Sequence, residues 1–173
     1  MPNLTTHIHF ALLIFERAQV DIHLPALVEG AVAPGLHSVQ DTFTHSHSRK
    51  AITGSFDYRL GYLSHSFLDH YFDAYRTEIF LFKSPVKEER MRAMSMAEQI
   101  DIMHIKEYET ELQSLSEKYG EVFANLYHAA STSKDQYMEI ERDYEDLMIG
   151  IAKKFNQLLK ALKLTPVSND LIP

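Results

Sequence analysis

The sequence predicts an all-α protein, a single-domain bundle of several helices. Apolar residues recur mostly at three- and four-residue spacing, which indicates helices, and alternating strand patterns are hard to find. Glycine and proline number only six each, so there are few strong breakers. A chain of 173 residues that is 45% hydrophobic suits one compact domain with a sizeable core. We expect that domain over residues 1–164 and a frayed tail over 165–173.

The N-terminal part predicts one long helix and then a broken segment. The first helix is expected over about Leu4 to Val20. After it, two prolines and two glycines are expected to break the chain into short helical segments: Pro25, Gly30, Pro34 and Gly35. A helix carrying the stretch LHSVQDTFTHSH (36–47) follows, and Gly54 ends that segment.

The next helix is expected over SFDYRLGYLSHSFLDHYFDAYR (55–76). Its large apolar side chains lie on both faces: Phe56, Leu60, Leu63, Phe67 and Tyr71 on one, and Tyr58, Tyr62 and Phe72 on the other. A helix that is apolar all round is buried. We therefore expect this helix at the centre of the bundle.

The C-terminal half predicts long amphipathic helices. Ser84 and Pro85, followed by two glutamates, form a good N-cap, first-turn proline and acidic first turn. This helix is expected to continue until Gly120 closes it, and a further helix follows to about His128. After the segment STSK, the last helix is expected over 137–162.

Composition excludes several classes of function. There are 24 acidic and 17 basic residues, and the net charge of −7 argues against non-specific binding to nucleic acids or anionic membranes. The basic stretch KKFNQLLKALK is one candidate patch, with a solvated helix face as its alternative. No basic residue precedes the apolar run FALLIF, and no stretch approaches a membrane span of about 20 apolar residues. A cytoplasmic protein is expected.

The histidines point to a metal site in the N-terminal half. The chain has no cysteine, so histidine, aspartate and glutamate are the only strong metal ligands. Eight of the ten histidines lie in the first 70 residues: His7, His9, His23, His37, His45, His47, His65 and His70. The long C-terminal helices are therefore expected to be the scaffold.

Helical spacing groups some of these histidines with carboxylates. Residues four apart share a face of a helix, which gives two stripes: His37, Asp41 and His45, and His65, Asp69 and Asp73. Two such stripes can enclose a cation, and a carboxylate buried among aromatic residues needs a cation or a hydrogen-bond donor. For each pair alone, a hydrogen-bonded core histidine is the alternative. His7 and His9 lie about 200° apart on a helix and cannot face one metal ion together.

Three segments resemble the acyl carrier protein phosphodiesterases, a helical family related to HD-domain phosphohydrolases. These segments are THIHFA, LHSVQDTFTHSH and GYLSHSFLDHYFDA. The matching positions are His7 and His9; Leu36, His37, Asp41, Phe43, Thr44 and His47; and Gly61, Asp69 and His70. The chain departs from the pattern at Ser38, where the family usually has arginine, and at His45 and His65, where it has aspartate.

A second resemblance is to helical zinc-dependent phospholipase C-like proteins. The segments MPNLTTH, EGAVAPG and GYLSHSFLD are similar to that family's Thr-His start, Ala-Pro-Asp turn and His-x-x-x-Asp helix, which holds zinc. Gly35 replaces the aspartate of the turn. Both resemblances imply hydrolysis of a phosphodiester with a metal ion in an all-helical fold.

The first resemblance implies a specific site. A Mn, Fe, Mg or Zn ion is expected among His37, Asp41, Asp69 and His70, with His9 and His65 as further ligands or as partners of the ligands. His47 or His45 is the expected general acid, because histidine exchanges protons near neutral pH. Arg49 and Lys50 are expected to hold the phosphate, and plain surface charge is their alternative.

Two readings of the biology stay open. The first is an enzyme that hydrolyses a phosphodiester. The resemblance to the acyl carrier protein phosphodiesterases implies that its substrate is an acyl carrier protein, from which it releases 4'-phosphopantetheine. The rival is a non-catalytic helical protein that binds a partner or forms a homodimer. The substitutions at Ser38, Gly35 and His45 favour this rival.

Overall fold

The computed structural model describes residues 2–18, 21–40, 54–76, 80–120, 123 and 134–162. For residues 37–40, 75–76, 80–81 and 134–137 it describes the backbone alone. The expected helix to about His128 lies outside these residues except for Phe123, and so does the expected tail over 165–173.

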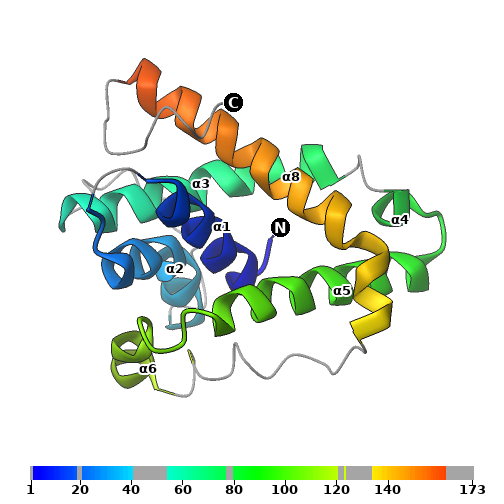
Figure 1. Ribbon diagram of the computed structural model, residues 1–173, viewed down its shortest axis with the longest axis horizontal. Coiled ribbons are helices and arrows are strands. Elements are labelled where there is room, and N and C mark those ends of the chain that lie inside the picture. Colours follow the sequence, from blue (N-terminus) through cyan, green and yellow to red (C-terminus); the bar gives the residue numbers. More distant parts are fainter. Residues whose placement is uncertain are drawn as a thin grey trace.

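The predicted all-α bundle is confirmed, and the described residues contain no strand (Figure 1). The helices are α1 (Leu4–Arg17), α2 (Leu24–Gln40), α3 (Phe56–Arg76), α4 (Phe80–Lys83), α5 (Lys87–Lys106), α6 (Gln113–Tyr119) and α8 (Lys134–Ala161). Their buried apolar residues form one continuous core from Ile8 to Leu159, as expected for a single domain. None of the described helices combines the length and hydropathy that a membrane span requires.

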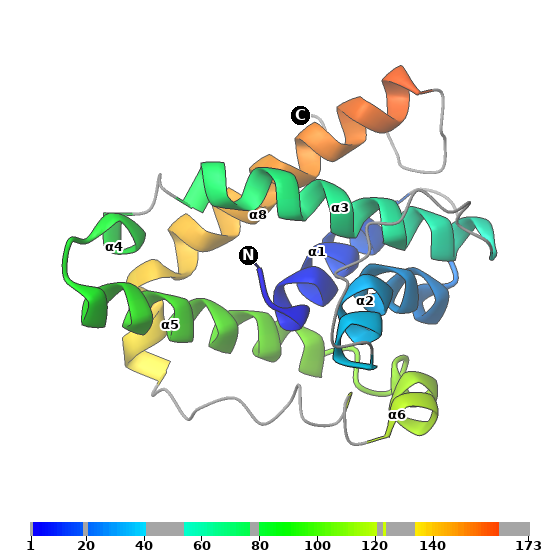
Figure 2. The same cartoon turned by 180° about the vertical axis from the view of Figure 1, so that it is seen from behind.

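The central helix is α1, not α3 as the sequence analysis expected. Every residue from Thr5 to Ile14 is buried, and α1 packs against α2, α3, α5 and α8 (Figure 2). Helix α3 lies further out, since Phe56 is 38% exposed and His70 is exposed. The difference arises because α1 carries no charged carboxylate or ammonium before Glu16, whereas α3 carries charged residues along its length.

Helix α1 begins at a side-chain cap. The Oδ1 atom of Asn3 accepts a hydrogen bond from the backbone N–H of Thr6 at 2.9 Å, which satisfies one of the donors left free at a helix start. The helix ends at Arg17 because Ala18 is extended, with φ −71° and ψ 134°. It is therefore three residues shorter than the sequence predicts.

The expected break between residues 25 and 35 is wrong, because α2 runs unbroken from Leu24 to Gln40. Its glycines serve packing. A Cβ atom on Gly30 would lie 2.0 Å from the carbonyl oxygen of Tyr58, and one on Gly61 of α3 would lie 2.0 Å from that of Leu27. Only glycine lets these two backbones approach so closely, so α2 and α3 form the most extensive helix pair in the described structure.

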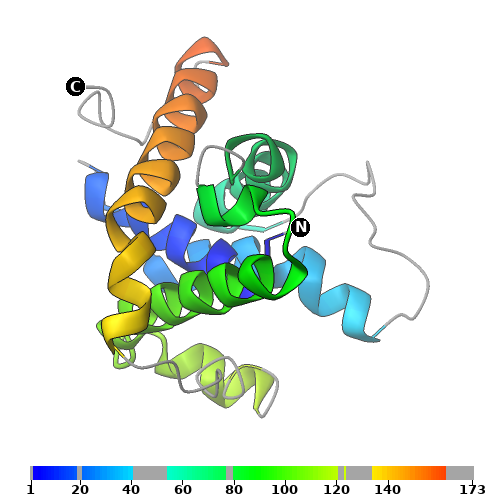
Figure 3. The same ribbon diagram turned by 90° about the vertical axis from the view of Figure 1, so that its right-hand side faces the viewer.

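The long helix expected from Ser84 to Gly120 is instead two helices. The Oγ atom of Ser84 accepts the N–H of Val86 at 3.1 Å, and α5 starts only after Val86. Helix α5 ends at Lys106, and turns over residues 107–112 lead into α6. Gly120 closes α6, as expected, with a φ of 57°. Figure 3 shows α6 on the far side of α5 from α3.

Candidate metal centre

A cluster of two histidines and one aspartate lies between α1 and α3. The Nε2 atom of His7 is 3.2 Å from Oδ1 of Asp69, and the Nε2 atom of His65 is 3.2 Å from Oδ2 of the same carboxylate. One donor atom from each residue lies within 4.8 Å of the other two. His65 and Asp69 meet because they are four residues apart on α3, as the sequence analysis expected.

The cluster is enclosed by protein. His7 and His65 are each 2% exposed, and the side chain of Asp69 is 12% exposed. The two imidazole rings stack with their centroids 3.6 Å apart and their planes 10° apart. Both rings turn their Nε2 atoms toward the carboxylate of Asp69.

The backbone of α2 fixes the tautomer of His65. Its Nδ1 atom lies 2.6 Å from the carbonyl oxygen of Ala31. A carbonyl oxygen has no proton, so Nδ1–H must be the donor, and in the neutral ring the lone pair then sits on Nε2. Nε2 lies 3.2 Å from Oδ2 of Asp69, so it meets this carboxylate either as the N–H donor of an imidazolium or, in the neutral ring, through a shared cation.

The protonation states suit metal ligands. Burial lowers the pKa of His7 to about 4, so its ring is neutral at neutral pH. Burial raises the pKa of Asp69, but hydrogen bonding by His65 and His7 outweighs this and holds the pKa well below its usual range. The cluster therefore offers one carboxylate and at least one neutral imidazole.

The donor set suits a divalent ion. Catalytic zinc sites use three protein ligands of this kind, two imidazoles and one carboxylate among them. Two ligands about 2.1 Å from a tetrahedral ion lie about 3.4 Å apart, whereas the two nitrogens approach different oxygens of Asp69 at 3.2 Å and one donor atom per residue lies within 4.8 Å of the others. The Nδ1 atom of His7 is buried and forms no hydrogen bond with the described residues.

Among the predicted ligands whose side chains the structure describes, His65 and Asp69 come together in the cluster. His70 is exposed on α3 and lines a groove of about 560 Å³ with Tyr71 and Lys154, between α3 and α8. His9 is buried but turns away from the cluster, because its Nδ1 atom is 2.8 Å from Oδ1 of Asp101.

The other predicted residues cannot be placed. Of His37, only the backbone is described, within α2. The remaining predicted residues lie outside the described part of the chain: Asp41, His45, His47, Arg49 and Lys50.

His7 was not among the predicted ligands. Its spacing from His9 places the two histidines on different sides of a helix, as observed, but spacing does not tell which side faces α3. The signal that could have found His7 was the Thr-His start of the phospholipase C-like resemblance, which falls on Thr6 and His7.

A second buried polar cluster surrounds Asp101 of α5, which is wholly buried. Its Oδ1 atom is 2.8 Å from Nδ1 of His9 and accepts the hydroxyl proton of Tyr144 at 2.8 Å. Its Oδ2 atom is 2.8 Å from Oγ1 of Thr6, which also lies 2.7 Å from Oδ1 of Asn3. The single hydroxyl proton of Thr6 serves one of these two acceptors at a time. Burial and the charge of Asp101 raise the pKa of Tyr144 well above its usual value, so Tyr144 stays a donor.

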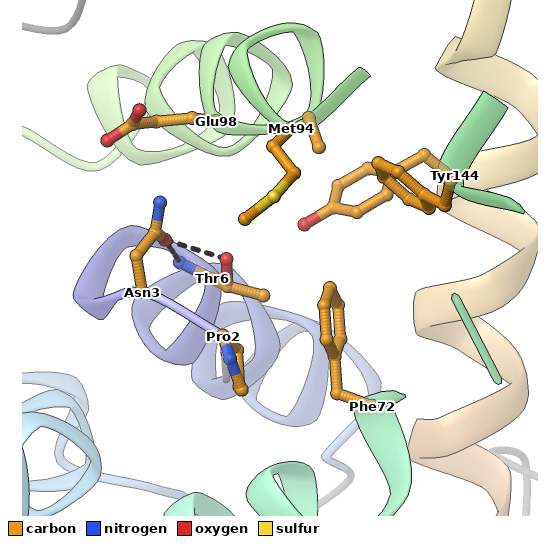
Figure 4. Close-up of a pocket in the computed structure, with 9 residues that line it drawn as sticks. Pro2, Asn3, Thr6, Phe72, Met94, Glu98 and Tyr144 are labelled. Atoms are coloured by element: carbon orange, nitrogen blue, oxygen red, sulfur yellow. Dashed lines mark hydrogen bonds between the residues drawn. The ribbon is translucent and has the colours of Figure 1, made fainter. Parts of the chain in front are cut away.

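A pocket of about 50 Å³ lies against this second cluster (Figure 4). Tyr144 and Phe72 face Thr6 across it, and Asn3 and Glu98 lie at its other end. The volume would hold about three to five waters, at roughly 10–15 Å³ each. Thr6 precedes His7, and Phe72 lies three residues after Asp69, so the pocket is within about one helical turn of two cluster residues.

Comparison with known proteins does not identify a family for this chain. No family model, no curated protein and no solved structure matches it.

Proposed function

We propose that the chain is a metal-dependent phosphodiester hydrolase whose ion is held by His7, His65 and Asp69. The observation that carries the proposal is the convergence of two buried imidazoles on one carboxylate. The Nε2 atoms of His7 and His65 each lie 3.2 Å from an oxygen of Asp69, and Nδ1–H of His65 is donated to the carbonyl of Ala31. Metal-binding histidines commonly donate their second nitrogen to a backbone carbonyl in this way.

The geometry favours the phospholipase C-like resemblance over the carrier-protein one. The cluster consists of the histidine of the Thr-His start and both ends of the His-x-x-x-Asp helix. The carrier-protein pattern relies on the Asp69–His70 pair, whose histidine is exposed and lies in a separate groove. The net charge of −7 also disfavours docking of an acidic carrier protein.

The chain's own residues would prepare the site as follows. His65 is oriented by Ala31 on α2, and Asp69 stays ionised between the two imidazoles. His7 is neutral and keeps a lone pair at neutral pH, because burial lowers its pKa. A divalent ion bound there would supply Lewis acidity toward a phosphoryl oxygen and would activate water. The buried rings exclude bulk water from the protein side of the ion.

Hydrolysis of an aryl phosphodiester by the purified protein tests this proposal. Bis(p-nitrophenyl) phosphate should be hydrolysed with added Zn²⁺ or Mn²⁺ and not after chelation. His65→Ala and Asp69→Asn should lose about 100-fold or more of this activity, because the first removes a ligand and the second replaces a charged ligand with a weaker neutral one. His70→Ala should keep it within about twofold, since His70 lies outside the cluster.

The variants also separate the two resemblances. Loss of activity in His70→Ala would favour the carrier-protein ligand set and contradict the one proposed. Release of a phospholipid headgroup, compared with release of phosphopantetheine from holo carrier protein, then identifies the substrate class. A wild-type protein without metal-stimulated turnover would contradict the enzyme proposal and leave the non-catalytic binding protein.

A further inference from the structure

We infer that Asp101 is a positioning residue for the metal centre, acting through the rotation of α1; this inference rests on the proposed function. Asp101 touches none of the three ligands in the cluster. It contacts two residues of α1 that lie before and after His7 in the sequence, Thr6 and His9, at 2.8 Å each.

The two anchor points lie on one face of α1, and His7 points away from them. Residues three apart on a helix are about 60° apart around its axis, so Thr6 and His9 share a face. His7 is about 100° from Thr6 and about 160° from His9, and it reaches Asp69 on α3. Because Asp101 of α5 holds the face with Thr6 and His9, it also fixes the direction in which His7 points toward α3.

A small rotation of α1 would disrupt the cluster. The Nε2 atom of His7 is roughly 6–7 Å from the helix axis, counting a Cα radius of about 2.3 Å and the side chain. A 10° turn would thus move it by about 1 Å, whereas ligand distances in metal sites hold within about 0.2 Å. Close packing around α1 also resists such a turn. The hydrogen bonds from Thr6 and His9 to one buried carboxylate add a directional restraint on the same angle.

The chemistry of the anchor supports a specific role. Asp101 is wholly buried, and a buried carboxylate is costly unless it is fully hydrogen-bonded. A third bond at 2.8 Å, from the hydroxyl of Tyr144 on α8, ties the same carboxylate to the bundle's longest described helix. The carboxylate of Asp101 is therefore fixed by α5, which carries it, and by Tyr144 of α8, while it contacts Thr6 and His9 of α1.

The matched control is a second polar link between α1 and the α5 segment. Glu16, near the end of α1, accepts hydrogen bonds from His104 at 2.6 Å and from Tyr108 at 2.9 Å. Glu16→Gln weakens that link about nine residues away from His7. If Asp101 only added stability, loss of either link would have the same effect on metal binding. If Asp101 positions His7, only loss of the Asp101 link weakens metal binding.

The test is Co²⁺ titration of the chelator-treated full chain, followed by its visible absorption spectrum, well below the unfolding temperature of each variant. Asp101→Asn and Thr6→Val should bind Co²⁺ about 10–100-fold more weakly and give an altered spectrum, as partners of metal ligands do when removed. Glu16→Gln should bind within about twofold of wild type with an unchanged spectrum. Thr6→Val keeps the experiment decisive if Asp101→Asn fails to fold.

The titration distinguishes failure of this inference from failure of the proposed function. Wild-type affinity and spectrum in both Asp101→Asn and Thr6→Val would overturn this inference and leave the metal site intact. A wild-type protein that binds no Co²⁺ would overturn the proposed function and this inference with it.

Discussion

The close contact of α2 and α3 predicts that Gly61→Ala destabilises the protein and disturbs the metal centre. A Cβ atom at Gly61 would lie 2.0 Å from the carbonyl oxygen of Leu27 and 2.8 Å from the backbone nitrogen of Ala31. Both neighbours are backbone atoms, which cannot rotate away. A carbon atom rarely approaches an oxygen closer than about 3.2 Å, so the helices would have to separate by about 1.2 Å.

The expected magnitude combines three effects. Overpacking of a close contact costs about 1–3 kcal/mol. A separation of about 1.2 Å would also stretch the 2.6 Å bond between His65 and Ala31 beyond hydrogen-bonding distance, at about 1–3 kcal/mol more. Alanine in a helix returns about 1 kcal/mol relative to glycine. The free energy of unfolding should therefore fall by roughly 1–5 kcal/mol.

Urea unfolding of two matched glycine variants measures this effect. Gly150 lies in α8, and a Cβ atom there would have nothing within 4 Å. Gly150→Ala should raise the free energy of unfolding by about 0.5–1 kcal/mol, because only helix propensity changes. Gly61→Ala should lower it and should weaken Zn²⁺ binding. Equal stabilisation of both variants would refute the packing argument.

Two further predictions concern α1. Burial lowers the pKa of His104, but Glu16 outweighs this and raises it, while His104 lowers the pKa of Glu16 against the effect of burial. The pairing is thus fully stabilising only between about pH 4.5, the unfolded pKa of Glu16, and about pH 6.5, the unfolded pKa of His104. The stabilisation is lost as pH rises through the folded pKa of His104, and also as pH falls through the folded pKa of Glu16. Glu16→Gln should cost under about 1 kcal/mol near pH 5.5 and less at pH 8, and an equal cost at both would contradict this reasoning. Asn3→Ala should cost about 1 kcal/mol through loss of the α1 cap, and an unchanged urea midpoint would count against that role.

Periodicity predicted most helices because their apolar residues recur at three- and four-residue spacing. Helix α3 starts within a residue of its expected start and ends where expected, and α8 overlaps almost all of the expected last helix. Helix α2 was missed because glycine and proline usually interrupt helices, and the contact that needs Gly30 lies 28 residues away, at Tyr58. The end of α5 at Lys106 carries no glycine or proline, so nothing local announced it.

The site was predicted only where its geometry is local. His65 and Asp69 share a helix, and their spacing alone placed them together. His7 and His9 belong to a helix buried on all sides, so the pattern of α1 does not reveal which face meets α3. Their partners, Asp69 and Asp101, lie 62 and 92 residues away, and only the packed bundle assigns them.

The metal centre is tested most directly by the stoichiometry of Zn²⁺ binding to chelator-treated protein, measured by isothermal titration calorimetry. We expect one ion per wild-type chain, one ion per His70→Ala chain, and binding at least about 100-fold weaker for His7→Ala. Absence of binding by the wild type, or wild-type affinity in His7→Ala, would contradict the proposed metal centre.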